Sequence, residues 1–294
     1  MQRRPPRSIA VAARVLACVL ALGCAGAPGD RNTAVPGEIS VVDADGRSVR
    51  LSAPAQRIVS LVPSATATLR ALGATDALVG RTDYDDQPWA ASLPSVGGGL
   101  EPSLEALVAL EPDLVIRFAG GQDPRTPARL EDLGIPYLAV RPDRLEDVYE
   151  TSRLLGEVTG HAAAGDSLAR AIEEGLRETA GATAGWPRLR VAYVLGGTPP
   201  WVSGPGTYLS QVVDLVGGDN VFSDLDALYA GVSPEELIVR EIDVVLLSGA
   251  ADFDPSLTPG ARIVDIGTAL EIPGPSVVDA ARRVAELMHG RSLR

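Results

Sequence analysis

Short apolar runs alternate with amphipathic stretches along most of this chain, and the alternation predicts strands that alternate with helices. In the first half, the β-branched run 57–62 and the apolar runs 113–118 and 137–140 have the length and composition of buried strands. A stretch with helical spacing of its apolar positions, 104–110, lies between two of them. Alternation at these lengths favours parallel pairing of the strands through right-handed crossovers.

The same alternation returns in the second half of the chain. Strands are expected at 189–195, 243–246 and 263–266, and helices at 208–216 and 277–288. The middle of the chain is helical by pattern and includes a segment at 162–179 that would be roughly 27 Å long. We therefore predict an α/β protein of two similar lobes with mostly parallel sheets, joined by a long interdomain helix. The predicted parts are an N-terminal lobe at 38–143, a helical connector at 144–186 and a C-terminal lobe at 187–294.

One pattern of residues occurs twice, 130 positions apart, and supports the prediction of two similar lobes. Each copy is typical of a capped helix, a turn and a buried strand. The spacing is too long for a solenoid repeat, so it indicates two related lobes with a cleft between them. The matching pairs are Ser103 and Ser233, Glu105 and Glu235, Leu107 and Leu237, Glu111 and Glu241, Asp113 and Asp243, and Val115 and Val245.

The N-terminus has the pattern of an export signal. Four arginines precede a short apolar run at 15–22, which is followed by Cys24. This pattern predicts a lipoprotein signal peptide at 1–23, lipidation of Cys24 and a flexible tether at 24–37. A plain secretory signal is the alternative. In both cases we expect the protein outside the cytoplasm, and lipidation would anchor it to the membrane.

Composition and charge exclude several classes of function. The chain carries a net charge of −12 and has no lysine, which makes it a poor candidate for binding nucleic acid. Its two histidines, His161 and His289, have no partners at the spacing of metal ligands. No nucleotide-binding loop or nucleophile motif is present in the sequence. We therefore expect a protein that is not an enzyme and that holds neither a metal nor a cofactor.

Two glutamates and four aromatic residues are the candidate site residues. Glu105 and Glu235 each fall early in a predicted helix, where the helix dipole alone would favour a carboxylate. Their equivalent positions on two lobes also suit a two-fold partner that carries arginines. The aromatic candidates lie at strand ends or in loops, which on two lobes would converge on one cleft. They are Tyr84, Phe118, Trp201 and Tyr229. The alternative for Phe118 and Trp201 is packing between the lobes.

Several segments give the chain a resemblance to a known family. They are Arg57-Ile-Val-Ser-Leu-Val-Pro-Ser-Ala-Thr66, Val79-Gly-Arg-Thr-Asp-Tyr84, Pro199-Pro-Trp-Val-Ser-Gly204 and Gly217-Gly-Asp-Asn-Val-Phe222, together with the repeated pattern. With them the chain resembles the class III, or helical-backbone, substrate-binding proteins of ABC importers, and among these the cobalamin binders. The resemblance implies a monomer that captures a bulky ligand between its lobes and delivers it to a permease dimer. It also implies that Glu105 and Glu235 pair with permease arginines and that the four aromatics contact the ligand.

The ligand implied first is cobalamin or a related corrinoid, and the alternatives are haem and a ferric siderophore. Haem would use Tyr84, and an anionic siderophore would use Arg81 and Arg117 if these face the cleft. Two departures from the cobalamin binders are visible, namely Gly99 in place of a tryptophan and the segment Leu270-Glu-Ile-Pro273. We expect the glycines at 97–99 to let the backbone approach something in the cleft. Alternatives of other classes are an exported α/β hydrolase and a purely structural lipoprotein.

Overall fold

The computed structural model describes residues 38–249 and 251–293. The predicted signal peptide, the tether and Cys24 lie outside these residues. The first part of the N-terminal lobe is a hairpin of β1 (Ile39–Val42) and β2 (Ser48–Leu51), which pair antiparallel around the turn at Asp45-Gly46. Gly46 has a φ of 77°, a left-handed conformation that glycine adopts without strain in a hairpin turn.

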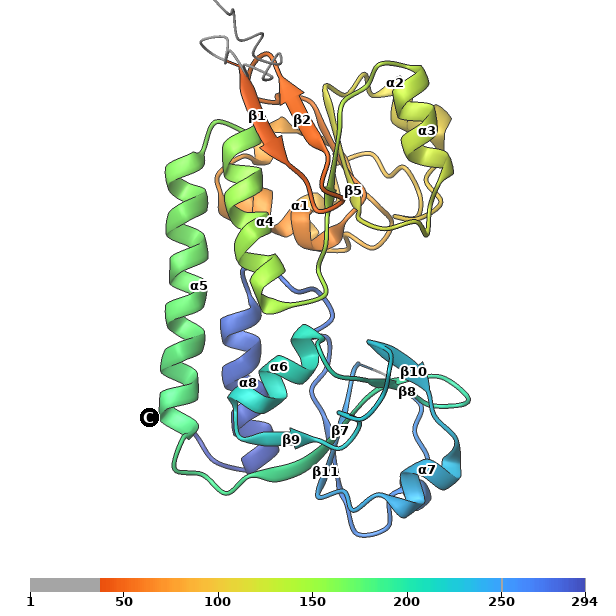
Figure 1. Cartoon of the computed structure of the whole chain (residues 1–294), viewed down its shortest axis with the longest axis vertical. Helices are drawn as coiled ribbons and strands as arrows, with labels where there is room; N and C mark the ends of the chain where they lie inside the picture. Colours follow the sequence, from red (N-terminus) through yellow and green to blue (C-terminus); the bar gives the residue numbers. More distant parts are fainter. Residues whose placement is uncertain (1–37, 250, 294) are drawn as a thin grey trace, which may run out of the picture. The chain divides into compact units, whose positions relative to one another are not determined.

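The N-terminal lobe is built on a sheet of four parallel strands in the order β4-β3-β5-β6 (Figure 1). The strands are β3 (Ile58–Ser60), β4 (Leu78–Gly80), β5 (Leu114–Phe118) and β6 (Tyr137–Val140). The helices of this lobe are α1 (Pro63–Ala71), α2 (Leu104–Ala109) and α3 (Arg125–Asp132), with 3₁₀ turns η1 (Thr75–Ala77) and η2 (Pro88–Ala90). Neighbouring residues of β5 enter separate apolar clusters, Leu114 in one and Val115 in the other. The sheet is thus buried on both faces, as parallel sheets are.

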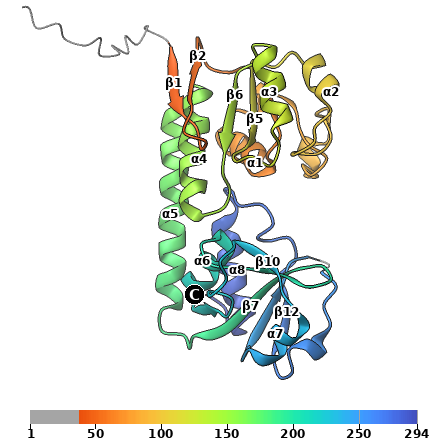
Figure 2. The same ribbon diagram turned by 45° about the vertical axis from the view of Figure 1, so that its right-hand side comes forward.

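Two helices connect the lobes, α4 (Leu145–Val158) and α5 (Ala162–Thr183). A Cβ at Gly165 would lie 2.7 Å from the backbone oxygen of Ser152, so glycine lets the two helices approach closely. α5 also packs against α6 and α8 of the C-terminal lobe, and Figures 1 and 2 both show it running beside α4 and α8. The long helix of the connector is thereby confirmed, and it ends at Thr183 rather than at the expected position 179.

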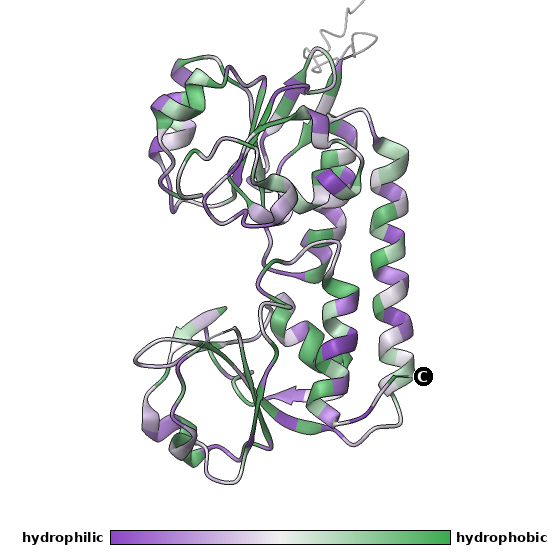
Figure 3. Ribbon diagram, turned by 180° about the vertical axis from the view of Figure 1, so that it is seen from behind, coloured by the Kyte–Doolittle hydropathy of each residue, from purple (hydrophilic) through white to green (hydrophobic). Residues whose placement is uncertain are grey.

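The C-terminal lobe has a mixed sheet in the order β10-β8-β7-β11-β12, with β9 paired to β7. Its strands are β7 (Leu189–Gly196), β8 (Trp201–Ser203), β9 (Gly218–Asn220), β10 (Tyr229–Gly231), β11 (Val244–Leu247) and β12 (Arg262–Asp265). Its helices are α6 (Tyr208–Leu215), α7 (Pro234–Val239) and α8 (Val277–His289), with the 3₁₀ turn η3 (Pro255–Leu257). Figure 3 shows apolar residues along the strands of both sheets, whereas α5 alternates between polar and apolar residues.

The predicted fold class is confirmed, and the differences are local. The pairs β7–β11 and β11–β12 are parallel, as expected, whereas β8 and β10 pair antiparallel and were not expected from the sequence. Both are three residues long, and Pro199-Pro200 precedes β8, so the local pattern is that of a loop. Helix α1 begins at Pro63, a residue type that suits the first helical position.

Candidate functional site

The repeated pattern forms the same local structure in both lobes. Ser103 Oγ accepts a hydrogen bond from Ala106 N (3.3 Å) at the start of α2, and Ser233 Oγ accepts one from Glu236 N (3.2 Å) at the start of α7. Glu105 and Glu235 follow in the first turn of each helix and are exposed to solvent. Within the described residues, neither carboxylate has an ion-pair partner within 4.0 Å. Each lobe therefore presents, at the equivalent position of a helix start, an exposed carboxylate without an ion-pair partner among the described residues.

Tyr84 lies in the loop that follows β4 at the carboxyl end of the N-terminal sheet. The buried Asp85 shapes this loop, because its Oδ2 accepts hydrogen bonds from Thr82 N (2.9 Å) and Thr82 Oγ1 (2.7 Å). Thr82 Oγ1 in turn accepts one from Tyr84 N (3.2 Å). The Tyr84 side chain is 68% exposed, so the fixed loop presents an aromatic ring and a hydroxyl to solvent.

Phe118 is the last residue of β5 and is half-buried. Its ring lies against Gly99, where a Cβ would be 3.0 Å from Phe118 Cε2 and 2.4 Å from the backbone oxygen of Leu61. Glycine at position 99 thus lets the backbone lie close to Leu61 and Phe118, and the expectation that the glycines approach something in the cleft stays a prediction. At this position the close neighbours belong to the chain itself, and this backbone has no room for a larger residue.

Trp201 begins β8 and is 50% exposed. Two glycine backbones lie beside its indole: a Cβ at Gly197 would be 3.1 Å from Trp201 Cδ1, and one at Gly231 would be 3.6 Å from Trp201 Nε1. Gly231 is also its cross-strand partner in β10. The indole is therefore supported by backbone and leaves half of its surface available for another molecule.

Tyr229 begins β10 opposite Ser203 and packs partly against the core of the C-terminal lobe. Burial, with a smaller contribution from the negative charge of Asp143, raises the pKa of the Tyr229 hydroxyl to about 12. The hydroxyl is thus neutral over the whole physiological range. Tyr229 is more enclosed than Tyr84 or Trp201.

Three leucines near the aromatic candidates in the sequence are exposed in the structure. They were not among the candidate site residues identified from the sequence. Leu100 follows Gly99, Leu195 lies in β7, and Leu228 precedes Tyr229. Their exposed fractions are between 39% and 41%. Only the fold distinguishes them from core leucines, because a single leucine at a strand end has no local signal of exposure.

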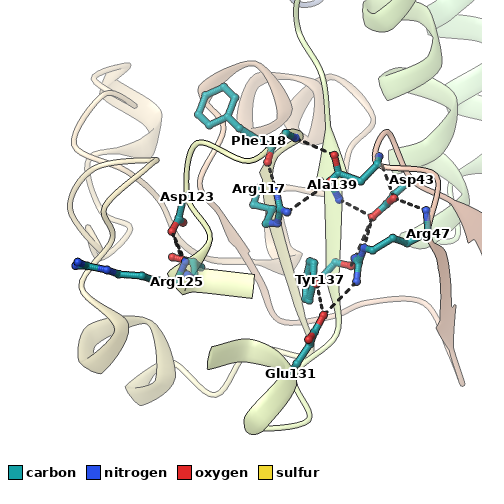
Figure 4. Close-up of polar contacts among 12 residues, drawn as sticks. Asp43, Arg47, Arg117, Phe118, Asp123, Arg125, Glu131, Tyr137 and Ala139 are labelled. Carbon is teal, nitrogen blue, oxygen red and sulfur yellow. Dashed lines mark hydrogen bonds and ion pairs between the residues drawn. The ribbon is translucent and has the colours of Figure 1, made fainter. Parts of the chain in front are cut away.

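The structure contradicts the expectation that Arg117 faces a ligand. Its side chain is buried, and Nη2 forms an ion pair with Asp45 Oδ2 at 3.0 Å. Its Nη1 donates to the backbone oxygen of Phe118 (Figure 4). Arg81 is also engaged, since its Nε donates to Ala90 O (2.9 Å) and its Nη1 to Thr82 O (2.7 Å). Each guanidinium thus already donates hydrogen bonds within the chain from two of its nitrogens.

Other features of the described surface lie away from the aromatic candidates. Two hollows, of about 500 Å³ and about 370 Å³, lie between α5 and α8 and between β1 and α4, and none of the predicted ligand residues lines either one. Over residues 38–249 and 251–293, no three or more histidine, cysteine or acidic side chains are grouped to hold a metal ion. Over the same residues, no helix has the length and apolar character needed to span a membrane.

Comparison with known proteins identifies the family. The family model "Periplasmic binding protein" matches residues 58–259. The chain belongs to this family. It is 30% identical over 196 residues to the vitamin B12-binding protein of Vibrio cholerae serotype O1, an alignment that covers 66% of this chain and 71% of that protein. It is 27% identical over 292 residues to the cobalamin-binding protein of Halobacterium salinarum, covering 91% and 78% respectively.

Solved structures agree with this assignment of the periplasmic binding protein family. The crystal structure of the periplasmic vitamin B12 binding protein of Vibrio cholerae matches with a TM-score of 0.70 and 26% identity, over 80% of this chain and 97% of that one. A periplasmic haem-binding protein from Pseudomonas aeruginosa matches with a TM-score of 0.72 and 23% identity, over 81% and 94%. The second similarity is one of fold alone. The resemblance stated from the sequence is confirmed at the level of the family.

Proposed function

We propose that this protein captures cobalamin or a related corrinoid between its two lobes and delivers it to the permease dimer of an ABC importer. The observation that carries the proposal is the presence of one exposed aromatic residue on each lobe, Tyr84 after β4 and Trp201 at the start of β8. A corrin ring is large and mostly apolar, and aromatic faces on either side of it supply contact area without charge. Phe118 and Tyr229 are the second, more enclosed aromatic of each lobe in this proposal.

The choice of ligand rests on two further observations. Relatives that match by sequence are named as vitamin B12- or cobalamin-binding proteins. Arg81 and Arg117, the arginines considered for an anionic ligand, are engaged within the chain. Both observations favour a ligand of low charge over an anionic siderophore.

Haem is the second candidate, and one specific observation supports it. The Tyr84 side chain is exposed in a fixed loop, and a tyrosine oxygen is one of the axial ligands that proteins offer to haem iron. Haem-binding proteins also share this fold. A ferric siderophore stays a third candidate for the same transport role.

Delivery to a permease is assigned to Glu105 and Glu235. Both carboxylates are exposed and unpaired within the described residues, at the starts of equivalent helices. Two acidic points repeated on two lobes fit a two-fold permease that presents one arginine to each lobe. We place the protein outside the cytoplasm, as a monomer held at the membrane by a lipid on Cys24. It has no enzymatic role in this proposal.

Thermal unfolding with three ligands tests the proposed function. A ligand that binds only the folded state stabilises it by about 2.7 kcal/mol at 100 times its dissociation constant. Cyanocobalamin is expected to raise the unfolding temperature, and each ligand should be recovered unchanged after incubation. A rise with haemin alone would keep the transport role and reassign the ligand. No rise with cyanocobalamin, haemin or a ferric hydroxamate would refute capture of these ligands, and a chemically altered ligand would support the hydrolase alternative.

A further inference from the structure

The turn of the N-terminal hairpin reaches the carboxyl ends of β5 and β6. Asp45 at this turn uses both of its carboxylate oxygens there: Oδ2 pairs with Arg117 Nη2 (3.0 Å) and Oδ1 accepts a hydrogen bond from Gly120 N (2.8 Å). Next to it, Ala44 N donates to Ala139 O (3.0 Å) on β6. A single side chain thus joins the hairpin to the end of β5 and to the loop that follows it.

Arg117 requires its ion pair with Asp45 because its side chain is buried. Arg117 is 8% exposed, and a buried guanidinium requires a counter-charge and hydrogen-bond acceptors. Among the described residues, Asp45 is its only ion-pair partner, and the Nε atom has no hydrogen-bond partner at all. Arg117 Nη1 donates to the carbonyl oxygen of Phe118, so the charge pair continues into the backbone of the aromatic residue.

Phe118 itself has no polar atom on its side chain, and backbone contacts and packing therefore set its position. From one side, Gly99 packs against the ring. From the other side, Arg117 holds the carbonyl of Phe118 and Asp45 holds the amide of Gly120, two residues further along. Figure 4 shows the Phe118 ring directed away from the polar cluster that contains Arg117, Tyr137 and Arg47.

We propose that Asp45 is a positioning residue of the ligand site, which acts through Arg117 and Gly120 to fix Phe118 and the loop 119–121. This inference rests on the proposed function, because it assigns Phe118 to the ligand. A hairpin that only stabilised the lobe would need no contact with this loop, whereas Asp45 directs one of its oxygens to Gly120.

The test uses Asp45→Ala, with Glu131→Gln as a matched control. Glu131 belongs to the same polar cluster, where it accepts a hydrogen bond from Tyr137 Oη (2.5 Å), but no hydrogen bond or ion pair joins it to Phe118 or Gly120. The first readout is hydrogen exchange of the Gly120 amide, which needs no ligand. We expect exchange to become at least about tenfold faster in Asp45→Ala and to stay within about twofold in the control.

The second readout is the dissociation constant for cyanocobalamin, measured in the natural chain and in the Phe118→Ala background. We expect Asp45→Ala to weaken binding about tenfold in the natural chain and less than about twofold in the Phe118→Ala background, because residues in one hydrogen-bond network are energetically coupled. Equal weakening in both backgrounds, or unchanged exchange at Gly120, would overturn the proposal.

Two results would change the test: failure of Asp45→Ala to fold, and failure of the natural chain to bind cyanocobalamin. If Asp45→Ala does not fold, Asp45→Asn takes its place, since the amide keeps an acceptor for Gly120 and removes only the charge opposite Arg117. We then expect a smaller loss of affinity that again depends on Phe118. If the natural chain does not bind cyanocobalamin, the proposed ligand fails, while exchange at Gly120 still decides whether Asp45 orders the loop.

Discussion

Asp113 and Asp243 make the same contact in the two lobes. Asp113 Oδ1 accepts a hydrogen bond from Arg57 N (2.9 Å), and Asp243 Oδ2 accepts one from Arg190 N (2.8 Å). In return, each aspartate donates its own backbone N–H to the carbonyl of the same arginine, at 2.9 Å in both lobes. The repeated aspartate therefore fixes the start of the neighbouring strand, and the sequence repeat corresponds to a repeated strand junction.

The junction at Asp243 predicts a dependence of stability on pH. Hydrogen bonds from the Arg190 side chain and backbone lower the pKa of the Asp243 carboxyl below its usual value. A lowered pKa in the folded state gives stability that is present above the unfolded value of about 3.9 and is lost as the pH falls through the folded value. Asp243→Asn should therefore lower the free energy of unfolding at pH 7, by less than about 1 kcal/mol because solvent screens the pair.

Urea denaturation of the natural chain and of Asp243→Asn at pH 7 and pH 3 measures this effect. The difference between the two proteins should shrink at pH 3, because this pH lies below the unfolded value and part of the contribution is already lost. A difference of the same size at both pH values would assign the effect to hydrogen bonding alone.

We expect that position 99 does not tolerate a residue with a side chain. A Cβ there would lie 2.4 Å from the carbonyl oxygen of Leu61, so Gly99→Ala should cost about 1–3 kcal/mol of unfolding free energy. Gly121→Ala is the matched control, because a Cβ at Gly121 would meet no atom within 4 Å. Chemical denaturation compares the two variants. Equal stability of both would mean that the loop moves freely away from Leu61.

Trp201 is expected to carry a large share of the binding energy for the ligand. Its indole is half exposed over a glycine backbone, and truncation of such an aromatic residue at an interface costs about 1–3 kcal/mol. Trp201→Ala should therefore weaken binding of cyanocobalamin without changing the unfolding temperature of the ligand-free protein. Trp186 lies against His289, away from the proposed site, and Trp186→Phe serves as the control. An unchanged dissociation constant in Trp201→Ala would remove this residue from the site.

The two docking glutamates are predicted to affect transport and not ligand binding. Reversal of both to arginine, Glu105→Arg with Glu235→Arg, should abolish uptake by opposing the arginines of the permease. The affinity of the purified variant for its ligand should stay the same. The double reversal Glu150→Arg with Glu173→Arg makes the same change of net charge at two exposed positions of α4 and α5. Normal uptake in the first variant, or equal loss in both, would refute the assignment.

Local patterns predicted most of the fold. β6 has the expected bounds and α8 begins at Val277, because apolar periodicity and flanking turns define both elements within a few residues. The short strands β8 and β10 were not predicted from the sequence. They are strands only because β8 pairs antiparallel with both β10 and β7.

The candidate site was less predictable than the fold. The sequence placed the aromatic candidates at strand ends or in loops, but it did not separate the exposed Tyr84 and Trp201 from the more enclosed Phe118 and Tyr229. The engagement of Arg117 depends on Asp45, which is 72 positions away in the chain. No local pattern contains such a pair, and only the folded chain brings the two charges together.

Calorimetric titration of the purified protein with cyanocobalamin shows whether this chain captures a corrinoid. We expect tight binding of one cobalamin per chain, with a negative heat-capacity change from the burial of aromatic surface. Binding of haemin under the same conditions, with no heat from cyanocobalamin, would contradict the claim that this chain captures a corrinoid.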